Sequence, residues 1–96
     1  MPGRSAPSSV RFTSRCDMRK VRFAYKRNPG VWGLAFPKEY RIEIDPYLTD
    51  QTLIDIAIHE TAHVVVPDLD EEAVDRLGRA CADVLWRMGF RKEEGT

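Results

Sequence analysis

The two histidines of this 96-residue chain stand four residues apart, in the stretch IHETAHV at positions 58–64. On an α-helix, side chains at positions i and i+4 lie one turn apart on the same face, so His59 and His63 would stand side by side. That spacing allows two imidazoles to bind one Zn²⁺ at about 2.0–2.1 Å each. Glu60 would lie about 100° further around the helix, close enough to contact a water on the metal without binding the metal itself.

This arrangement of residues is the HExxH pattern of zinc metalloproteases. In that chemistry zinc polarises the substrate carbonyl and lowers the pKa of its water toward about 7, and the glutamate transfers the proton of the water to the leaving amine. The sequence therefore predicts His59 and His63 as zinc ligands and Glu60 as the general base. The alternative is a buried helix whose polar side chains are satisfied by hydrogen bonds alone, which needs a dedicated network.

A third zinc ligand is expected, because a catalytic zinc usually keeps three protein ligands and the chain has no third histidine. Carboxylates follow at once in PDLDEE, as Asp68, Asp70, Glu71 and Glu72. We favour Glu71, which begins the next helix at the edge of its apolar stripe, ahead of Asp70 and then Asp68; Glu72 points away from that stripe. Asp70 is also the best N-cap, and acidic residues in a first helical turn complement the helix dipole without any metal.

Two helices must position these residues. Residues 51–65 carry apolar side chains on nearly every side, which predicts a buried helix with Thr49 or Asp50 as its N-cap and Pro67 just after its end. A second helix is expected over residues 71–88. Its predicted apolar stripe consists of Ala73, Val74, Leu77, Ala80, Cys81, Val84, Leu85 and Met88. The short connection predicts an antiparallel helical hairpin.

Three stretches ahead of the helices alternate apolar and polar residues, which is the pattern of half-buried strands. They are KVRFAYK (20–26), VWGLAF (31–36) and YRIEI (40–44), and the turn sequence RNPG separates the first two. Short connections of this kind favour an antiparallel meander. We therefore expect an α+β fold in which a small three-stranded antiparallel sheet packs on the helical hairpin that carries HExxH.

The composition predicts one domain without a membrane segment. Ninety-six residues suit a single modest core, and no apolar run approaches the roughly 20 residues that cross a bilayer. The N-terminal stretch lacks the apolar region of a signal peptide, and Cys16 and Cys81 form no CxxC pattern, which indicates reduced thiols and a cytoplasmic location. Residues 1–18 are predicted to be a flexible basic arm, residues 19–91 the domain and residues 92–96 a tail.

Charge is divided unevenly along the chain, although its formal net charge is zero. Residues 1–41 hold ten lysines and arginines against two acids, whereas residues 42–96 hold five against thirteen. A basic half can bind nucleic acid or an acidic partner, or the two halves can simply pack together. No aromatic-and-basic motif of a known nucleic-acid reader accompanies the charges, so nucleic-acid binding is not the favoured interpretation.

These motifs resemble those of the zincins, and more narrowly those of a minimal gluzincin. HETAH followed by EEAVDRLGRACADVLW is similar to the pattern of ImmA/IrrE-type metallopeptidases, in which a glutamate on the following helix completes the site. Over about residues 20–91 the chain is also similar to short phage and prophage proteins with a strand meander, IHE..H, PDL.EE.V and a closing LWRMGFR. The resemblance implies His59 and His63 as ligands, Glu60 as base and an acid near Glu71 as third ligand.

The expected function is thus a zinc-dependent metallopeptidase of phage or prophage origin that acts on a peptide or protein. Two other functions remain open from the sequence. One is a non-catalytic zinc-binding phage structural or host-interaction protein. The other is a nucleic-acid-associated protein that uses the basic N-terminal half.

Overall fold

The structure is a computed structural model in which residues 19–93 are described. The predicted flexible arm, residues 1–18, and residues 94–96 of the predicted tail lie outside the described residues. In chain order the elements are β1 (Arg22–Tyr25), β2 (Gly33–Phe36), the short 3-10 helix η2 (Pro37–Glu39), β3 (Arg41–Ile44), α1 (Gln51–Val65) and α2 (Glu71–Arg87). The α+β class expected from the sequence is confirmed.

The sheet is mixed, so the prediction of an all-antiparallel meander was wrong. The strand order is β1-β3-β2, and β3 pairs in parallel with β1 and antiparallel with β2. Seven residues connect β1 to β2, which is too long for the two-residue turn that forces neighbouring strands to pair. β3 is the most buried strand, with Ile42, Glu43 and Ile44 all buried, and it therefore takes the central position between the other two.

Both helices begin where the capping residues predict. Asp50 is the N-cap of α1 and accepts a hydrogen bond from the main-chain N–H of Thr52 at 2.9 Å. Asp70 is the N-cap of α2 and accepts from the N–H of Ala73 at 2.8 Å. These side-chain caps satisfy main-chain donors that a helix leaves free at its first turn. The expected helical hairpin is therefore present, with its second helix ending one residue earlier than predicted.

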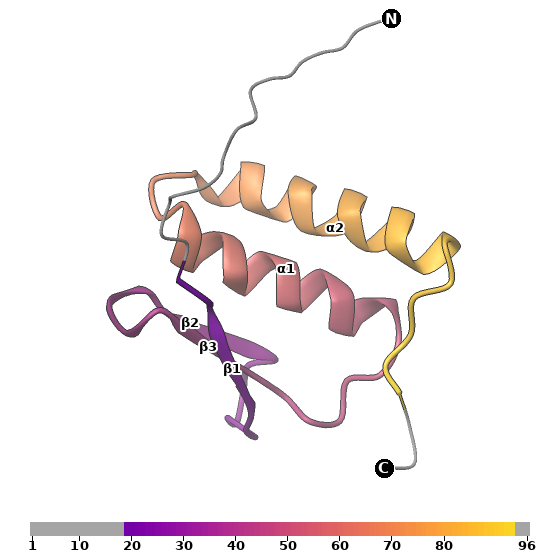
Figure 1. The fold of residues 1–96 in the computed structure, drawn as a ribbon, viewed down its shortest axis with the longest axis horizontal. Helices are drawn as coiled ribbons and strands as arrows, with labels where there is room; N and C mark the ends of the chain where they lie inside the picture. The colour runs from indigo at the N-terminus through magenta and orange to yellow at the C-terminus, as the bar shows by residue number, and fades with distance from the viewer. Residues whose placement is uncertain (1–18, 94–96) are drawn as a thin grey trace, which may run out of the picture.

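The elements stack as three layers, with α1 between the sheet and α2 (Figure 1). Ile42 and Ile44 of β3 pack against Val64 of α1 to form the core between the first two layers. Small residues of α2 face α1 in the other interface, where a Cβ added at Gly78 would lie only 2.6 Å from Asp55 Oδ1. The small side chains allow the two helices to approach closely.

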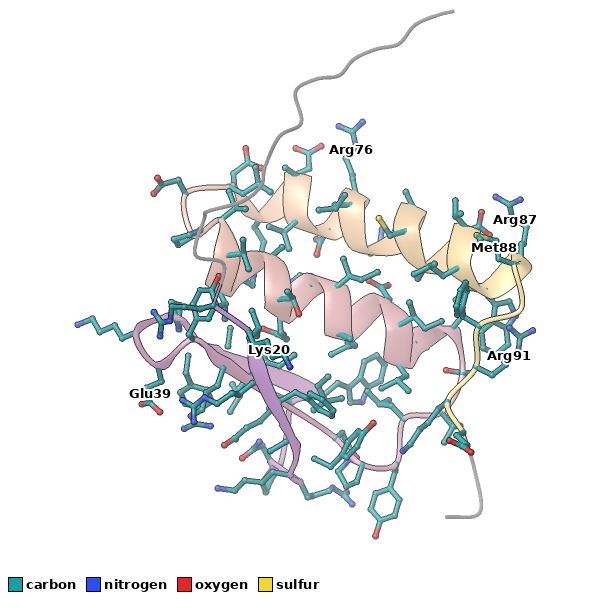
Figure 2. All side chains as sticks on the ribbon, viewed as in Figure 1. Lys20, Glu39, Arg76, Arg87, Met88 and Arg91 are labelled. Atoms are coloured by element: carbon teal, nitrogen blue, oxygen red, sulfur yellow. The ribbon has the colours of Figure 1, made fainter. Side chains whose placement is uncertain are left out.

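The helices are less buried than their sequences predicted. A middle helix contacts the sheet on one side and α2 on the opposite side, which leaves its two flanks open. Most of α1 is therefore half-buried, and Val65 is exposed. Leu77, Val84 and Met88 of the predicted α2 stripe are also exposed, and Figure 2 shows Met88 projecting from the end of α2. Neither helix of residues 19–93 is long and apolar enough to cross a membrane.

Candidate metal centre

One flank of α1 brings both histidines together with the first residue of α2. His59 Nε2 lies 3.1 Å from His63 Nε2 and 3.1 Å from Glu71 Oε2, and His63 Nε2 lies 3.3 Å from Glu71 Oε1. This is the group of three potential metal ligands found among residues 19–93. The two oxygens of one carboxylate thus face the two imidazoles.

These separations fit a single zinc ion. Ligands that surround zinc tetrahedrally at about 2.0–2.1 Å lie about 3.3–3.4 Å from one another. The two Nε2 atoms lie 3.1 Å apart, close to that value, and they contact two different oxygens of Glu71 at 3.1 and 3.3 Å. With one ligand atom taken from each residue, all three atoms lie within 4.8 Å of one another. The side chain of Glu71 is 66% exposed, whereas those of His59 and His63 are 16% and 27% exposed, so the cluster opens to solvent on the Glu71 side. Two nitrogens and one carboxylate with an open side are the donor set of a catalytic zinc site.

The other predicted acids lie elsewhere. Asp70 uses its carboxylate to cap α2, and this cap fixes the start of the helix at Glu71. Asp68 and Glu72 are exposed and do not join the group of potential ligands. Among the four alternatives that the sequence left open, the geometry therefore favours Glu71.

Asp75 is a neighbour of the cluster that the sequence did not reveal. Its Oδ1 lies 3.2 Å from His59 Nδ1. A carboxylate at that position accepts a hydrogen bond from Nδ1–H, which fixes the tautomer and leaves Nε2 free to bind a metal. Asp75 is thus placed where it could orient His59.

The antiparallel register of the two helices explains this arrangement. Because the helices are antiparallel, a residue four positions earlier in α1 faces a residue four positions later in α2. His63 therefore lies beside Glu71, and His59 lies beside Asp75. The same spacing leads next to Asp55 in α1 and Arg79 in α2, and both residues line the cavity next to His59. The sequence contains the contact between Asp75 and His59 as the pattern HxxxH followed by ExxxD. The pattern identifies Asp75 as a neighbour of His59 only once the register of α2 against α1 is known.

Glu60 lies toward β2 rather than toward α2. A Cβ added at Gly33 of β2 would come within 2.9 Å of Glu60 Cγ and 2.7 Å of Ile56 Cγ2, so the strand passes directly over this part of α1. The resulting burial raises the pKa of Glu60 above its usual range, and this effect outweighs the opposite influence of the two imidazoles. A carboxylate with a raised pKa is a stronger base, as a general base near neutral pH requires.

A cavity of about 340 Å³ adjoins the cluster. His59 and Glu60 line it from α1, Asp75 and Arg79 from α2, and Trp32 from the segment before β2. Trp32 is more than half exposed, so the cavity has an open apolar rim beside the predicted base.

Comparison of the chain with protein-family models, with curated proteins and with solved structures finds no match. The resemblance to zincins therefore stays a prediction from the motifs. The arrangement of His59, Glu60, His63 and Glu71 is what bears on function.

Proposed function

We propose that this protein is a zinc-dependent peptidase that hydrolyses peptide bonds with Glu60 as general base. The observation that carries the proposal is the meeting of His59, His63 and Glu71 within 3.1–3.3 Å of one another, one residue away from a half-buried glutamate. In the alternative without a metal, the Nε2 atoms of His59 and His63 would still face each other at 3.1 Å, and at most one of them could donate a hydrogen bond to the other.

His59, His63 and Glu71 are the residues that would hold the zinc. Bound zinc supplies Lewis acidity, which lowers the pKa of water and polarises a substrate carbonyl. Asp75, whose Oδ1 lies 3.2 Å from His59 Nδ1, would orient the imidazole of His59 by accepting its Nδ1–H. The described residues offer three ligands at this place, whereas a structural zinc site is closed by four, and this difference favours a catalytic role.

Glu60 performs the proton transfers. Its carboxylate takes a proton from the attacking water and passes it to the leaving amine, and the raised pKa makes it a stronger base than an exposed glutamate. The close approach of Gly33 to Glu60 helps to shield the carboxylate from solvent.

β2 is the element that would align the substrate. β2 is an edge strand of the sheet in residues 19–93, because β3 pairs with one side of β2 and the other side of β2 is free. An extended peptide can therefore add to its free edge through main-chain hydrogen bonds, next to Gly33 and Glu60. Val31 and Trp32 are exposed just before the strand and favour an apolar substrate side chain near the bond that is cleaved.

The test compares metal content and hydrolysis in the same preparations. Wild type should bind about one zinc per chain and cleave members of a fluorogenic peptide library, whereas His59→Ala/His63→Ala should lose both properties. Glu60→Gln should keep zinc and lose hydrolysis, because an amide cannot accept the proton of water. Glu72→Gln, at an exposed acid in the first turn of α2, is the matched control and should change neither.

Two results would contradict the proposal at different levels. Full zinc occupancy in the double histidine variant would remove the metal assignment. Zinc binding by wild type and Glu60→Gln, with equal inertness across the library, would instead favour a non-catalytic zinc-binding protein.

A further inference from the structure

A groove with a volume of about 510 Å³ lies along the second open flank of α1. Its lining residues come from β1, β3, α1 and the chain that follows α2. Its lining is almost entirely apolar and includes Phe23 and Tyr25 of β1, Ile54 and Ile58 of α1, and Phe90. None of its lining residues lines the cavity beside the histidines, so the two sites are separate.

Aromatic side chains remain exposed along this groove. Phe23 is 64% exposed and Tyr25 47% exposed, although they lie opposite the buried Ile42 and Ile44 in the sheet. α1 covers β2 and β3, which leaves the helix-facing side of β1 uncovered. Two adjacent exposed aromatic residues beside a deep apolar groove are typical of a docking surface.

The free edge of β1 adds a row of unpaired main-chain groups to this surface. The N–H groups of Arg22 and Lys26 donate to Tyr40 O and Ile44 O across the parallel pair with β3. Main-chain groups alternate in direction along a strand, so those of Phe23 and Tyr25 point away from β3. An extended segment can therefore pair with this edge, and every second side chain of that segment would enter the groove.

The charges around the groove indicate what such a segment carries. Five cations belong to β1, its ends and the chain after α2. Arg91 and Lys92 line the groove, whereas Lys20, Arg22 and Lys26 alternate with Phe23 and Tyr25 and so lie on the other face of the strand. None of the five forms an ion pair within residues 19–93, and the hydrogen bonds of Arg22, Arg91 and Lys92 go to main-chain carbonyls. Figure 2 shows Lys20 at the start of the sheet, just before β1, and Arg91 beyond the end of α2. Glu93 is the one acidic residue in the lining.

We propose that β1 and this groove bind an extended segment of a partner protein in which apolar and acidic residues alternate. Its apolar side chains fill the groove over Phe23, Tyr25 and Ile58. Its carboxylates lie on the opposite face of the extended sheet, where they meet Lys20, Arg22 and Lys26 across the strand pair. This proposal does not depend on the metal centre.

Two other occupants fit the surface less well. A second copy of the chain that paired β1 with β1 would set Lys and Arg residues opposite one another, which is unfavourable. A single-stranded nucleic acid needs its phosphates and stacked bases on one side, whereas the cations and aromatic rings of β1 alternate between the two faces. Lys92 also lies over the ring of Tyr25, with its Nζ 4.5 Å from the ring centroid, and occupies a stacking face.

The test uses the full chain and two labelled synthetic nonapeptides, one alternating glutamate with valine and one alternating lysine with valine. Fluorescence anisotropy should show the glutamate peptide binding at least ten-fold more tightly than the lysine peptide. Phe23→Asp should weaken that binding at least ten-fold while zinc binding and the circular dichroism spectrum stay unchanged, because Phe23 is mostly exposed. Arg22→Glu/Lys26→Glu should reverse the peptide preference, and amide NMR shifts should centre on Phe23 and Tyr25.

Several outcomes would overturn the proposal. Absence of binding, or equal binding of both peptides, would remove the predicted complementarity. A dimer in sedimentation that Phe23→Asp dissociates would assign the groove to a second copy. Displacement of the glutamate peptide by mixed-sequence single-stranded DNA at physiological salt would assign the surface to nucleic acid.

Discussion

Removal of the Asp75 carboxylate should weaken zinc binding without touching a ligand. Asp75 Oδ1 lies 3.2 Å from His59 Nδ1, where it can accept a hydrogen bond, so Asp75→Ala should free the imidazole to rotate and to change tautomer. Loss of such an outer carboxylate typically costs ten- to hundred-fold in metal affinity, or about 1.4–2.7 kcal/mol. The Asp75 side chain is 43% exposed, and water can replace part of its contact with His59. We therefore expect the lower end of that range, about ten-fold.

The measurement is a competition titration against a chromophoric zinc chelator at fixed pH. Asp75→Asn is the informative second variant, because its side-chain carbonyl can still accept from Nδ1–H without the negative charge. It should lose less affinity than Asp75→Ala. Asp83→Ala is the matched control on the same helix, since Asp83 pairs with Arg87 at the surface and is not among the ligand group.

The reasoning would be refuted if Asp75→Ala bound zinc as tightly as wild type and as Asp83→Ala. It would also be refuted if Asp75→Ala abolished binding as completely as His59→Ala does, since Asp75 would then act as a ligand itself. Circular dichroism of the metal-free variants separates either result from a loss of fold.

Three further predictions follow from close contacts and burial. Gly78→Ala should destabilise the fold by about 1–3 kcal/mol in denaturant titration, because its Cβ would lie 2.6 Å from Asp55 Oδ1 and 3.2 Å from the main-chain oxygen of Asp55; unchanged stability would show that the helices are further apart. Gly33→Ala should reduce hydrolysis but keep zinc, because its Cβ would push against Glu60 Cγ and leave the histidines in place; parallel loss of zinc would contradict this separation. Glu60→Gln should stabilise the metal-free protein at pH 7, because burial raises the folded-state pKa of Glu60 and disfavours its ionised form. This gain in stability should vanish below about pH 4, where the carboxyl is protonated in both the folded and the unfolded state. A gain that persists at low pH would show that burial of the charge is not the cause.

The two helices were predicted well from the sequence, because the residues that start a helix and define its faces act within one or two turns. Asp50 and Asp70 mark helix starts through contacts within one turn, and the spacing of His59 and His63 is meaningful on any helix. The pairing of the strands was not predictable in the same way. Which strand lies in the centre depends on how much of each is buried in the finished fold, and this placed β3 between two strands that precede it in the chain.

Parts of the candidate site were hidden for the same reason. Asp75 acquires its contact with His59 only through the register of α2 against α1. Gly33 signals a close approach of the main chain, but the sequence does not say that the approaching residue is Glu60. The groove beside β1 exists because no element of residues 19–93 covers that strand, which cannot be deduced from the alternation of its side chains.

The position of the ligand group on a helical hairpin has a consequence for how the site assembles during folding. His59, His63, Glu71 and Asp75 all belong to two helices joined by the short loop 66–70, so only a small loop-closure entropy opposes their meeting. The parallel pairing of β1 with β3 joins residues about nineteen apart and contributes non-local contacts that form more slowly. We therefore expect the metal ligands to come together with the hairpin, early in folding. The environment that turns Glu60 into a strong base forms later, when β2 packs over it.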